Sequence, residues 1–170
     1  MTDIIFLVLL FAHIGTVVLW MGASVLYVSV LGPSIAKLAP SSRADLIKAI
    51  GTRYERYLVR NATIAIAAGL ILYAYISQAS SGLAPSSSGL PWILVGIIFG
   101  LAAYVMGIAV VMRANRGLMK LMGQSPAGQT GPTTPSPEMT RLQRRVAMGS
   151  GIQALLLFIA LLSMVVGANL

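Results

Sequence analysis

The sequence predicts an all-α fold, a four-helix transmembrane bundle with both termini outside and two basic cytoplasmic loops. The chain has 170 residues, a mean hydropathy of +0.86 and only 9% charged residues, which is too apolar for a soluble globular protein. It also contains four apolar stretches near the length of about 20 residues that a bilayer span requires. All 12 Lys and Arg residues lie between the first and second stretch or between the third and fourth. Short loops rich in Lys and Arg stay on the cytoplasmic side, which predicts the orientation.

We expect a single integral membrane domain over residues 1–170, with spans at about 4–31, 57–77, 91–112 and 146–168. The first stretch is too long for the apolar part of a signal peptide and follows Asp3 instead of a basic cluster. It is therefore predicted to be a retained helix. We expect it to end near Gly32-Pro33, because helices tend to stop before proline.

The other three spans have recognisable beginnings. An amphipathic helix starting near Ser42 is predicted to continue into the second span. Pro91-Trp92 opens the third, which we expect to run to about Met122. Ser136 as N-cap and Pro137 at the first position open the fourth, predicted as one long helix. The Gly-, Ser- and Pro-rich residues 123–137 are predicted to form a flexible cytoplasmic linker.

The basic residues lie at the inner ends of the predicted spans, where they set orientation and contact anionic lipid headgroups. This placement argues against nucleic-acid binding in spite of the formal charge of +8. The predicted membrane-surface residues are Arg43, Lys48, Arg53, Arg56, Arg60, Arg113, Arg116, Lys120, Arg141, Arg144 and Arg145.

The composition excludes several kinds of chemistry. The chain has no cysteine, which excludes disulfides, iron–sulfur clusters, thiolate metal sites and covalently attached haem. It also has no Gly-rich phosphate loop, no His/carboxylate cluster and no serine near a usable base. We therefore predict no catalytic residues and expect no catalytic activity of its own.

His13 is the only ionisable side chain, tyrosines aside, deep in a predicted span, and such residues often mark functional sites. Two roles are open. A neutral imidazole could hydrogen-bond a neighbouring helix, or it could bind haem b or, as a second choice, copper. One His supplies only one ligand, so the second would come from a Met, a water or another subunit. Met164 lies nearest in depth along the helices.

Two stripes of small residues predict close helix packing, because small side chains let helix backbones approach in membranes. One stripe lies on the third span and consists of Gly96, Gly100, Ala103 and Gly107. The other lies on the second span and consists of Ala62, Ala65 and Gly69. The partner of each stripe, another span or another subunit, is left open.

The first span resembles the first helix of the copper-resistance-D-like (CopD-like) group of small four-helix membrane proteins. The resemblance rests on residues 12–15, with His13, on residues 19–23, with Trp20 and Gly22, and on residues 30–33. An Arg before the second span, Arg56 or Arg60, also fits, as does the small-residue run Ala65–Gly69. The resemblance implies a plasma-membrane bundle with a role in copper handling or haem-linked redox chemistry. Members with a clearer metal or haem role have further His residues, which this chain lacks.

Three functions remain open at this point. The first is a non-catalytic subunit of a larger membrane complex, such as a respiratory one. The second is a haem- or copper-binding redox or transport protein that uses His13. The third is a membrane anchor for a soluble partner. We expect a multi-pass protein of the plasma membrane, in contact with the lipid bilayer and with other membrane subunits or a second copy.

Overall fold

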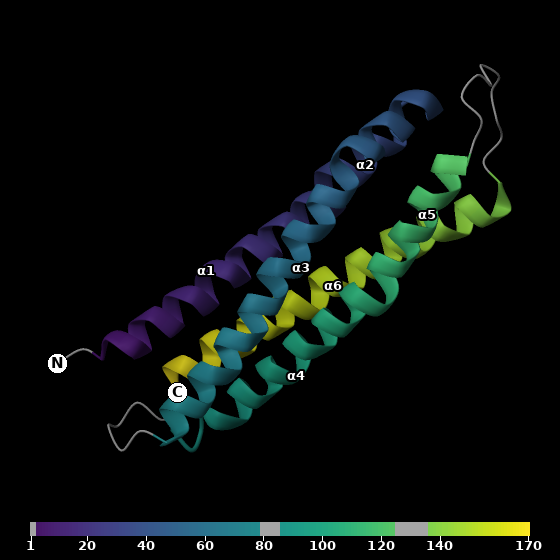
Figure 1. Cartoon of the computed structure of the whole chain (residues 1–170). Helices are drawn as coiled ribbons and strands as arrows, with labels where there is room; N and C mark the ends of the chain where they lie inside the picture. The colour runs from purple at the N-terminus through teal and green to yellow at the C-terminus, as the bar shows by residue number, and fades with distance from the viewer. Residues whose placement is uncertain (1–2, 79–85, 125–135) are drawn as a thin grey trace.

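The computed structural model describes residues 3–78, 86–124 and 136–170, and every regular element in these ranges is a helix. Figure 1 shows four long rods side by side. In chain order they consist of α1 (Ile4–Leu26), the π-helical turn η1 (Tyr27–Leu31), α2 (Gly32–Ala36), α3 (Pro40–Gln78), α4 (Leu90–Met106), the π-helical turn η2 (Gly107–Met112), α5 (Arg113–Gln124) and α6 (Pro137–Asn169). All four rods are long and apolar enough to cross a bilayer, which confirms the predicted four-helix transmembrane bundle. The protein is therefore a multi-pass membrane protein.

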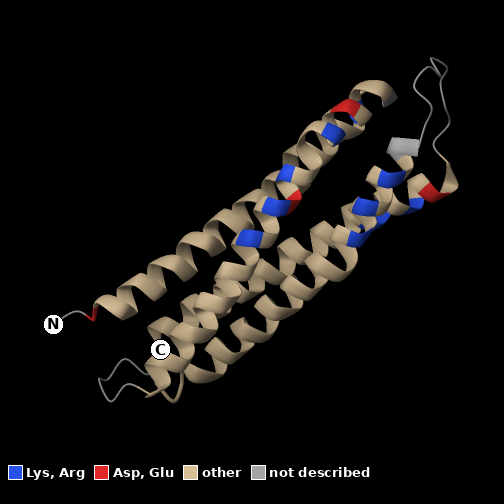
Figure 2. Ribbon diagram, in the orientation of Figure 1, with Lys and Arg blue, Asp and Glu red and all other residues tan. Residues whose placement is uncertain are grey.

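The bundle consists of two helical hairpins. In the first hairpin, α1 packs against α3, and η1 and α2 continue the first rod; in the second hairpin, α4, η2 and α5 pack against α6. Packing within each hairpin is far more extensive than packing between them, and the hairpins diverge toward the end where α2 and α5 lie (Figure 1). Lys and Arg gather at this same end, here called the basic end (Figure 2). Both termini lie at the opposite end, here called the terminal end. The side of the membrane that each end faces stays a prediction.

The first rod does not end at Gly32-Pro33, as the sequence predicted, but continues through α2 to Ala36. A proline ring normally clashes with the carbonyl group four residues earlier and leaves it without a donor. Here the turn before Pro33 is π-helical, and the Gly32 amide donates to the carbonyl of Tyr27, five residues earlier. A widened turn of this kind accommodates a local change in the hydrogen-bond ladder without ending the helix.

The other predicted elements agree with the structure. The amphipathic segment and the second span form the single helix α3, and the third rod continues past Met122 to Gln124. At the start of α6, the Ser136 side chain accepts a hydrogen bond from the amide of Met139 at 3.2 Å, as expected of an N-cap. Most of the linker predicted at 123–137 lies outside the described residues.

The two hairpins meet closely near the middle of the bundle. Trp20 of α1 is only 2% exposed and forms a core with Ala62, Ala65, Ala103 and Leu157. Tyr104 of α4 meets the Trp20 ring edge-on, with ring centroids 6.5 Å apart, and its hydroxyl lies 3.0 Å from the Thr63 hydroxyl of α3. One aromatic side chain of the second hairpin thus contacts both helices of the first.

Glycines bring the helices of the second hairpin together. A Cβ atom at Gly89 would lie 2.3 Å from the carbonyl oxygen of Gly167, and one at Gly96 would lie 2.6 Å from Cγ of Met164. Backbone therefore packs against backbone at the terminal end of this hairpin, an approach that only small residues allow.

We expect Gly89→Ala to destabilise the second hairpin by about 1–3 kcal/mol, because the added methyl group collides with backbone and not with a mobile side chain. Thermal unfolding in detergent measures the loss. Gly22→Ala is the matched control, since a Cβ at Gly22 meets no atom within 4 Å. Equal midpoints for Gly89→Ala and Gly22→Ala would contradict the assigned packing.

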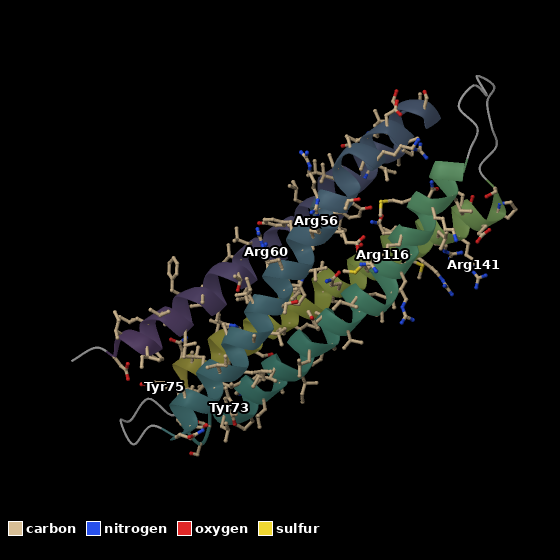
Figure 3. All side chains as sticks on the ribbon, in the orientation of Figure 1. Arg56, Arg60, Tyr73, Tyr75, Arg116 and Arg141 are labelled. Atoms are coloured by element: carbon tan, nitrogen blue, oxygen red, sulfur yellow. The ribbon has the colours of Figure 1, made fainter. Side chains whose placement is uncertain are left out.

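At the terminal end, Asp3 joins α1 to α3. Its carboxylate caps α1 by accepting a hydrogen bond from the Ile5 amide at 3.0 Å, and it also accepts one from the Tyr75 hydroxyl. Figure 3 labels Tyr75 and its neighbour Tyr73 on α3. The Tyr75 hydroxyl is the main cause that holds the pKa of Asp3 below its ordinary value of 3.8, because a donor stabilises the charged carboxylate.

Because the folded pKa of Asp3 is depressed, its contribution to stability is present above pH 3.8 and is lost as the pH falls through the folded pKa. Tyr75→Phe removes the main donor and should raise the pKa of Asp3 toward 3.8. Carbon-13 NMR titration of the Asp3 carboxyl group measures this rise. Tyr73→Phe should leave the titration unchanged, and an equal rise in both variants would refute the assignment.

Candidate functional site

The space where the hairpins diverge is a cleft of about 470 Å³ at the basic end of the bundle. Most of its walls are apolar side chains from both hairpins. Polar side chains converge on it from all four rods, and these are Ser24, Tyr27, Arg43, Tyr54, Glu55, Tyr104, Asn115, Gln143, Ser150 and Gln153. A largely apolar cavity of this size with a few convergent polar groups is typical of a small-molecule site.

Both π-helical turns in the described part of the chain line this cleft. Tyr27, Val28 and Leu31 of η1 face it from the first hairpin. Residues Gly107, Ile108, Val111 and Met112 of η2 line it from the second hairpin. π-helical turns are rare in proteins, and those that occur often lie at functional sites. Their coincidence at one cavity is a second reason to regard the cleft as the functional site.

Aromatic side chains close the inner end of the cleft and cover one wall. Trp20 and Tyr104, which join the hairpins at mid-bundle, also line the cleft. Nearer the basic end, the rings of Tyr27 and Tyr54 stack with centroids 5.5 Å apart. The Tyr54 hydroxyl donates to the carbonyl of Ala23 at 2.8 Å, so this ring pair holds α1 to α3.

The ion pair between Glu55 of α3 and Arg116 of α5 connects the two hairpins across the cleft. Nε of Arg116 donates to one carboxylate oxygen, Oε1, at 2.7 Å, and Nη2 lies 2.6 Å from the same oxygen while it donates to Sδ of Met112 at 3.3 Å. The Glu55 side chain is 12% exposed, whereas that of Arg116, labelled in Figure 3, is 65% exposed. The second oxygen of Glu55, Oε2, is buried and has no hydrogen-bond partner among the described residues.

Among the described residues that line the cleft, Arg43 is the only cation, and two of its three nitrogens, Nε and Nη2, are already engaged. Its guanidinium group donates to the carbonyls of Ile35, Ala36 and Leu38 at 3.1, 2.6 and 3.1 Å. These carbonyls belong to the end of α2 and the residues just after it, which have no partners within their own helix. Arg43 therefore holds the first rod against the start of α3.

His13 lies outside the cleft, at the seam between α1 and α3. Its Nδ1 donates to the carbonyl of Ala65 at 2.8 Å, and its ring lies against Gly69, where a Cβ would sit 2.6 Å from Cε1. Because a carbonyl oxygen only accepts, Nδ1 carries a proton, and in the neutral imidazole Nε2 then has the lone pair. This is the tautomer that an imidazole ligand uses, with the other nitrogen oriented by a carbonyl. His13 therefore fits the role of a single ligand.

His13 and Met164 pack in different hairpins. His13 lies against Ala65 and Gly69 in the first hairpin, and Met164 packs against Gly96 in the second. In the part of the chain that is described, no three His, Cys, Asp or Glu residues come together as a metal site would require.

The small-residue stripes contact helices of this same chain. Ala62, Ala65 and Ala103 are buried in the core between the hairpins, Gly69 receives His13, and Gly96 receives Met164. Gly100 is buried, and Gly107 faces Gln153, whose Nε2 lies 2.6 Å from the position of a Cβ. Apart from Arg43, which is half-buried, the predicted membrane-surface residues are exposed at the basic end (Figure 2).

Sequence reasoning missed the cleft and the role of Glu55. Glu55 lies between Arg53 and Arg56 in a run of charges, and this setting suggests an exposed ionic face. The available signal was its position next to Tyr54 on the amphipathic helix, one turn before the apolar span begins. Neither π-helical turn has a periodicity that predicts it, although Pro33 marks the end of η1.

No family model, no curated protein and no solved structure matches this chain.

Proposed function

We propose that this protein binds a small lipophilic molecule in the cleft between its hairpins. The observation that carries the proposal is the cleft itself, about 470 Å³, mostly apolar, and lined by both π-helical turns. Its volume falls within the range of about 300–1,000 Å³ that is usual for small-molecule sites. In a helix bundle without a binding role, we would expect the two hairpins to pack against each other at this end as well.

The position of the cleft indicates how the ligand approaches. The lining residues come from the half of the bundle that contains α2, α5 and the starts of α3 and α6. A ligand would therefore enter from the membrane leaflet at the basic end, which the charge distribution predicts to be cytoplasmic. Because Trp20 lines the inner end, its fluorescence reports on the arrival of a ligand.

The chain has two tryptophans, so Trp92→Phe leaves Trp20 as the only fluorescent indole. In lipid nanodiscs of this variant, a long-chain molecule tipped with bromine should quench Trp20 with saturation. Ala147 lines the cleft and is exposed, so Ala147→Phe should fill the space and weaken binding about tenfold or more. Titration of the fluorescence measures both effects.

Ala67→Phe is the matched control, because Ala67 is an exposed residue of α3 that does not line the cleft. It should bind as the parent does. Quenching that rises linearly without saturation, or that Ala147→Phe leaves unchanged, would refute the proposal.

A second candidate function rests on His13. With Nδ1 held by the Ala65 carbonyl, Nε2 would be the atom that binds haem b or, less well, copper. Such a group would supply electron transfer, which the side chains of this chain do not provide. The second ligand would come from another subunit, a second copy or a small molecule.

A reduced-minus-oxidised visible spectrum of protein gently extracted from its native membrane tests this candidate. We expect an α-band that is lost in His13→Ala and kept in Thr16→Val, one turn along the same helix. Thr16 bonds only to carbonyls of its own helix, at 2.6 and 3.2 Å, so its loss should leave a ligand at His13 in place. A colourless, metal-free protein would leave His13 as a packing residue.

The two other functions inferred from the sequence stay predictions. A non-catalytic subunit role is compatible with ligand binding, and the outer face of α1, with Phe11 82% exposed, is open to lipid or to another membrane protein. A membrane-anchor role would use the exposed basic residues of α3, α5 and α6. Proteins that co-purify from the native membrane distinguish these roles, since an integral partner favours the first and a soluble partner the second.

A further inference from the structure

Resting on the proposed function, we infer that the ligand of the cleft carries a neutral hydrogen-bond donor, such as the hydroxyl group of a long-chain alcohol or a hydroxyl-headed lipid. Glu55 Oε2 accepts that hydrogen bond. Three features of the site point to this class of ligand. They are an oxygen without a hydrogen-bond partner, nearby cations that already have partners, and apolar walls.

The unpartnered oxygen is the first feature. Both contacts of Arg116 with Glu55, the hydrogen bond from Nε and the ion-pair contact of Nη2, are to Oε1, and Oε2 is buried without a partner among the described residues. Buried polar atoms are nearly always hydrogen-bonded, and an unsatisfied charged group is the most unfavourable kind. Because Glu55 lines the cleft, a ligand in the cleft is well placed to supply the missing donor after a small side-chain adjustment.

The charges of the site select a neutral donor. Arg116 already balances the charge of Glu55, so a cationic ligand would add an uncompensated charge to a largely apolar cavity. An anionic ligand would be repelled by the Glu55 carboxylate, and Arg43, the one cation among the described lining residues, already donates to three carbonyls through Nε and Nη2. A hydroxyl group avoids both penalties and satisfies Oε2.

The walls accommodate the rest of the ligand. Leu58, Ile108 and Val111 line the cleft from both hairpins, and Trp20 and Tyr104 close its inner end. A ligand whose polar head lies at Glu55 would extend its apolar chain between the hairpins toward Trp20. A bromine atom at the far end of such a chain would approach the Trp20 indole, which makes quenching sensitive to this orientation.

The test compares three bromine-tipped molecules of one chain length: the alcohol, its methyl ether and the matching carboxylate. The ether accepts but cannot donate a hydrogen bond, and the carboxylate is charged. In Trp92→Phe nanodiscs, we expect the alcohol to bind about tenfold tighter than the ether, since hydrogen bonds to charged groups are the stronger ones. The carboxylate should bind more weakly than the alcohol. Ala147→Phe provides the baseline for quenching from the bilayer.

Glu55→Gln sharpens the test. The amide oxygen of the new side chain can keep the hydrogen bond from Arg116, and its NH₂ group then lies where Oε2 was. The position then donates instead of accepting, so the advantage of the alcohol over the ether should disappear. Glu138→Gln changes an exposed carboxylate at the start of α6 that does not line the cleft, and it should leave the tenfold difference intact.

The outcomes separate this inference from the proposed function. Two outcomes would overturn the inference that the ligand carries a hydrogen-bond donor: equal affinity for the alcohol and the ether in saturable quenching, or tightest binding by the carboxylate. Either outcome would still leave the cleft a binding site. Absence of saturable quenching by all three would overturn the proposed function itself. The comparison of ligands on the parent protein requires no change at Glu55, so it decides the inference even where Glu55→Gln fails to fold.

Discussion

The close contact of the two hairpins at mid-bundle is the constraint on which the rest of the structure depends. Lipid tails are as apolar as the helices, so helices in a membrane associate mainly by close packing and hydrogen bonds. This chain meets that requirement where Trp20 packs against Ala62, Ala65 and Ala103. Toward the basic end the lining mixes small residues, such as Gly32 and Gly51, with larger ones, such as Ile47 and Ile108. The hairpins diverge there, and the cleft is the result.

Polar interactions then stabilise the divergent end without closing it. Arg43 holds α2 to α3, the stacked pair of Tyr27 and Tyr54 holds α1 to α3, and the ion pair of Glu55 and Arg116 spans the two hairpins. All of these groups belong to the basic end, which the charge distribution predicts to lie at a membrane–water interface, where long polar side chains can reach water. The same arrangement leaves one oxygen of Glu55, a residue that lines the cleft, buried and without a partner among the described residues.

Much of the fold could be predicted because it depends on local composition. The four spans follow from apolar length, the single helix α3 from the continuity of its amphipathic start, and the start of α6 from Ser136 and Pro137. The passage of the first rod beyond Pro33 could not be predicted, because it depends on a widened turn that no pattern announces. The cleft could not be predicted either, since it arises from the relation between two hairpins distant in sequence. The sequence singled out His13 because ionisable side chains are rare inside a span. It did not single out Glu55 because that residue lies among other charged residues.

The separation into two hairpins has a consequence for biosynthesis. Most of the packing of α1 against other rods is with α3, the next long helix, and most of that of α4 is with α6. Partners close in sequence meet early and at little entropic cost. The first hairpin can therefore assemble in the bilayer while the ribosome is still making the second, in keeping with the N-terminal-first order of folding. The cleft then forms only when the two completed hairpins dock, which is a late step. A substitution that misfolds either hairpin therefore prevents the cleft from forming.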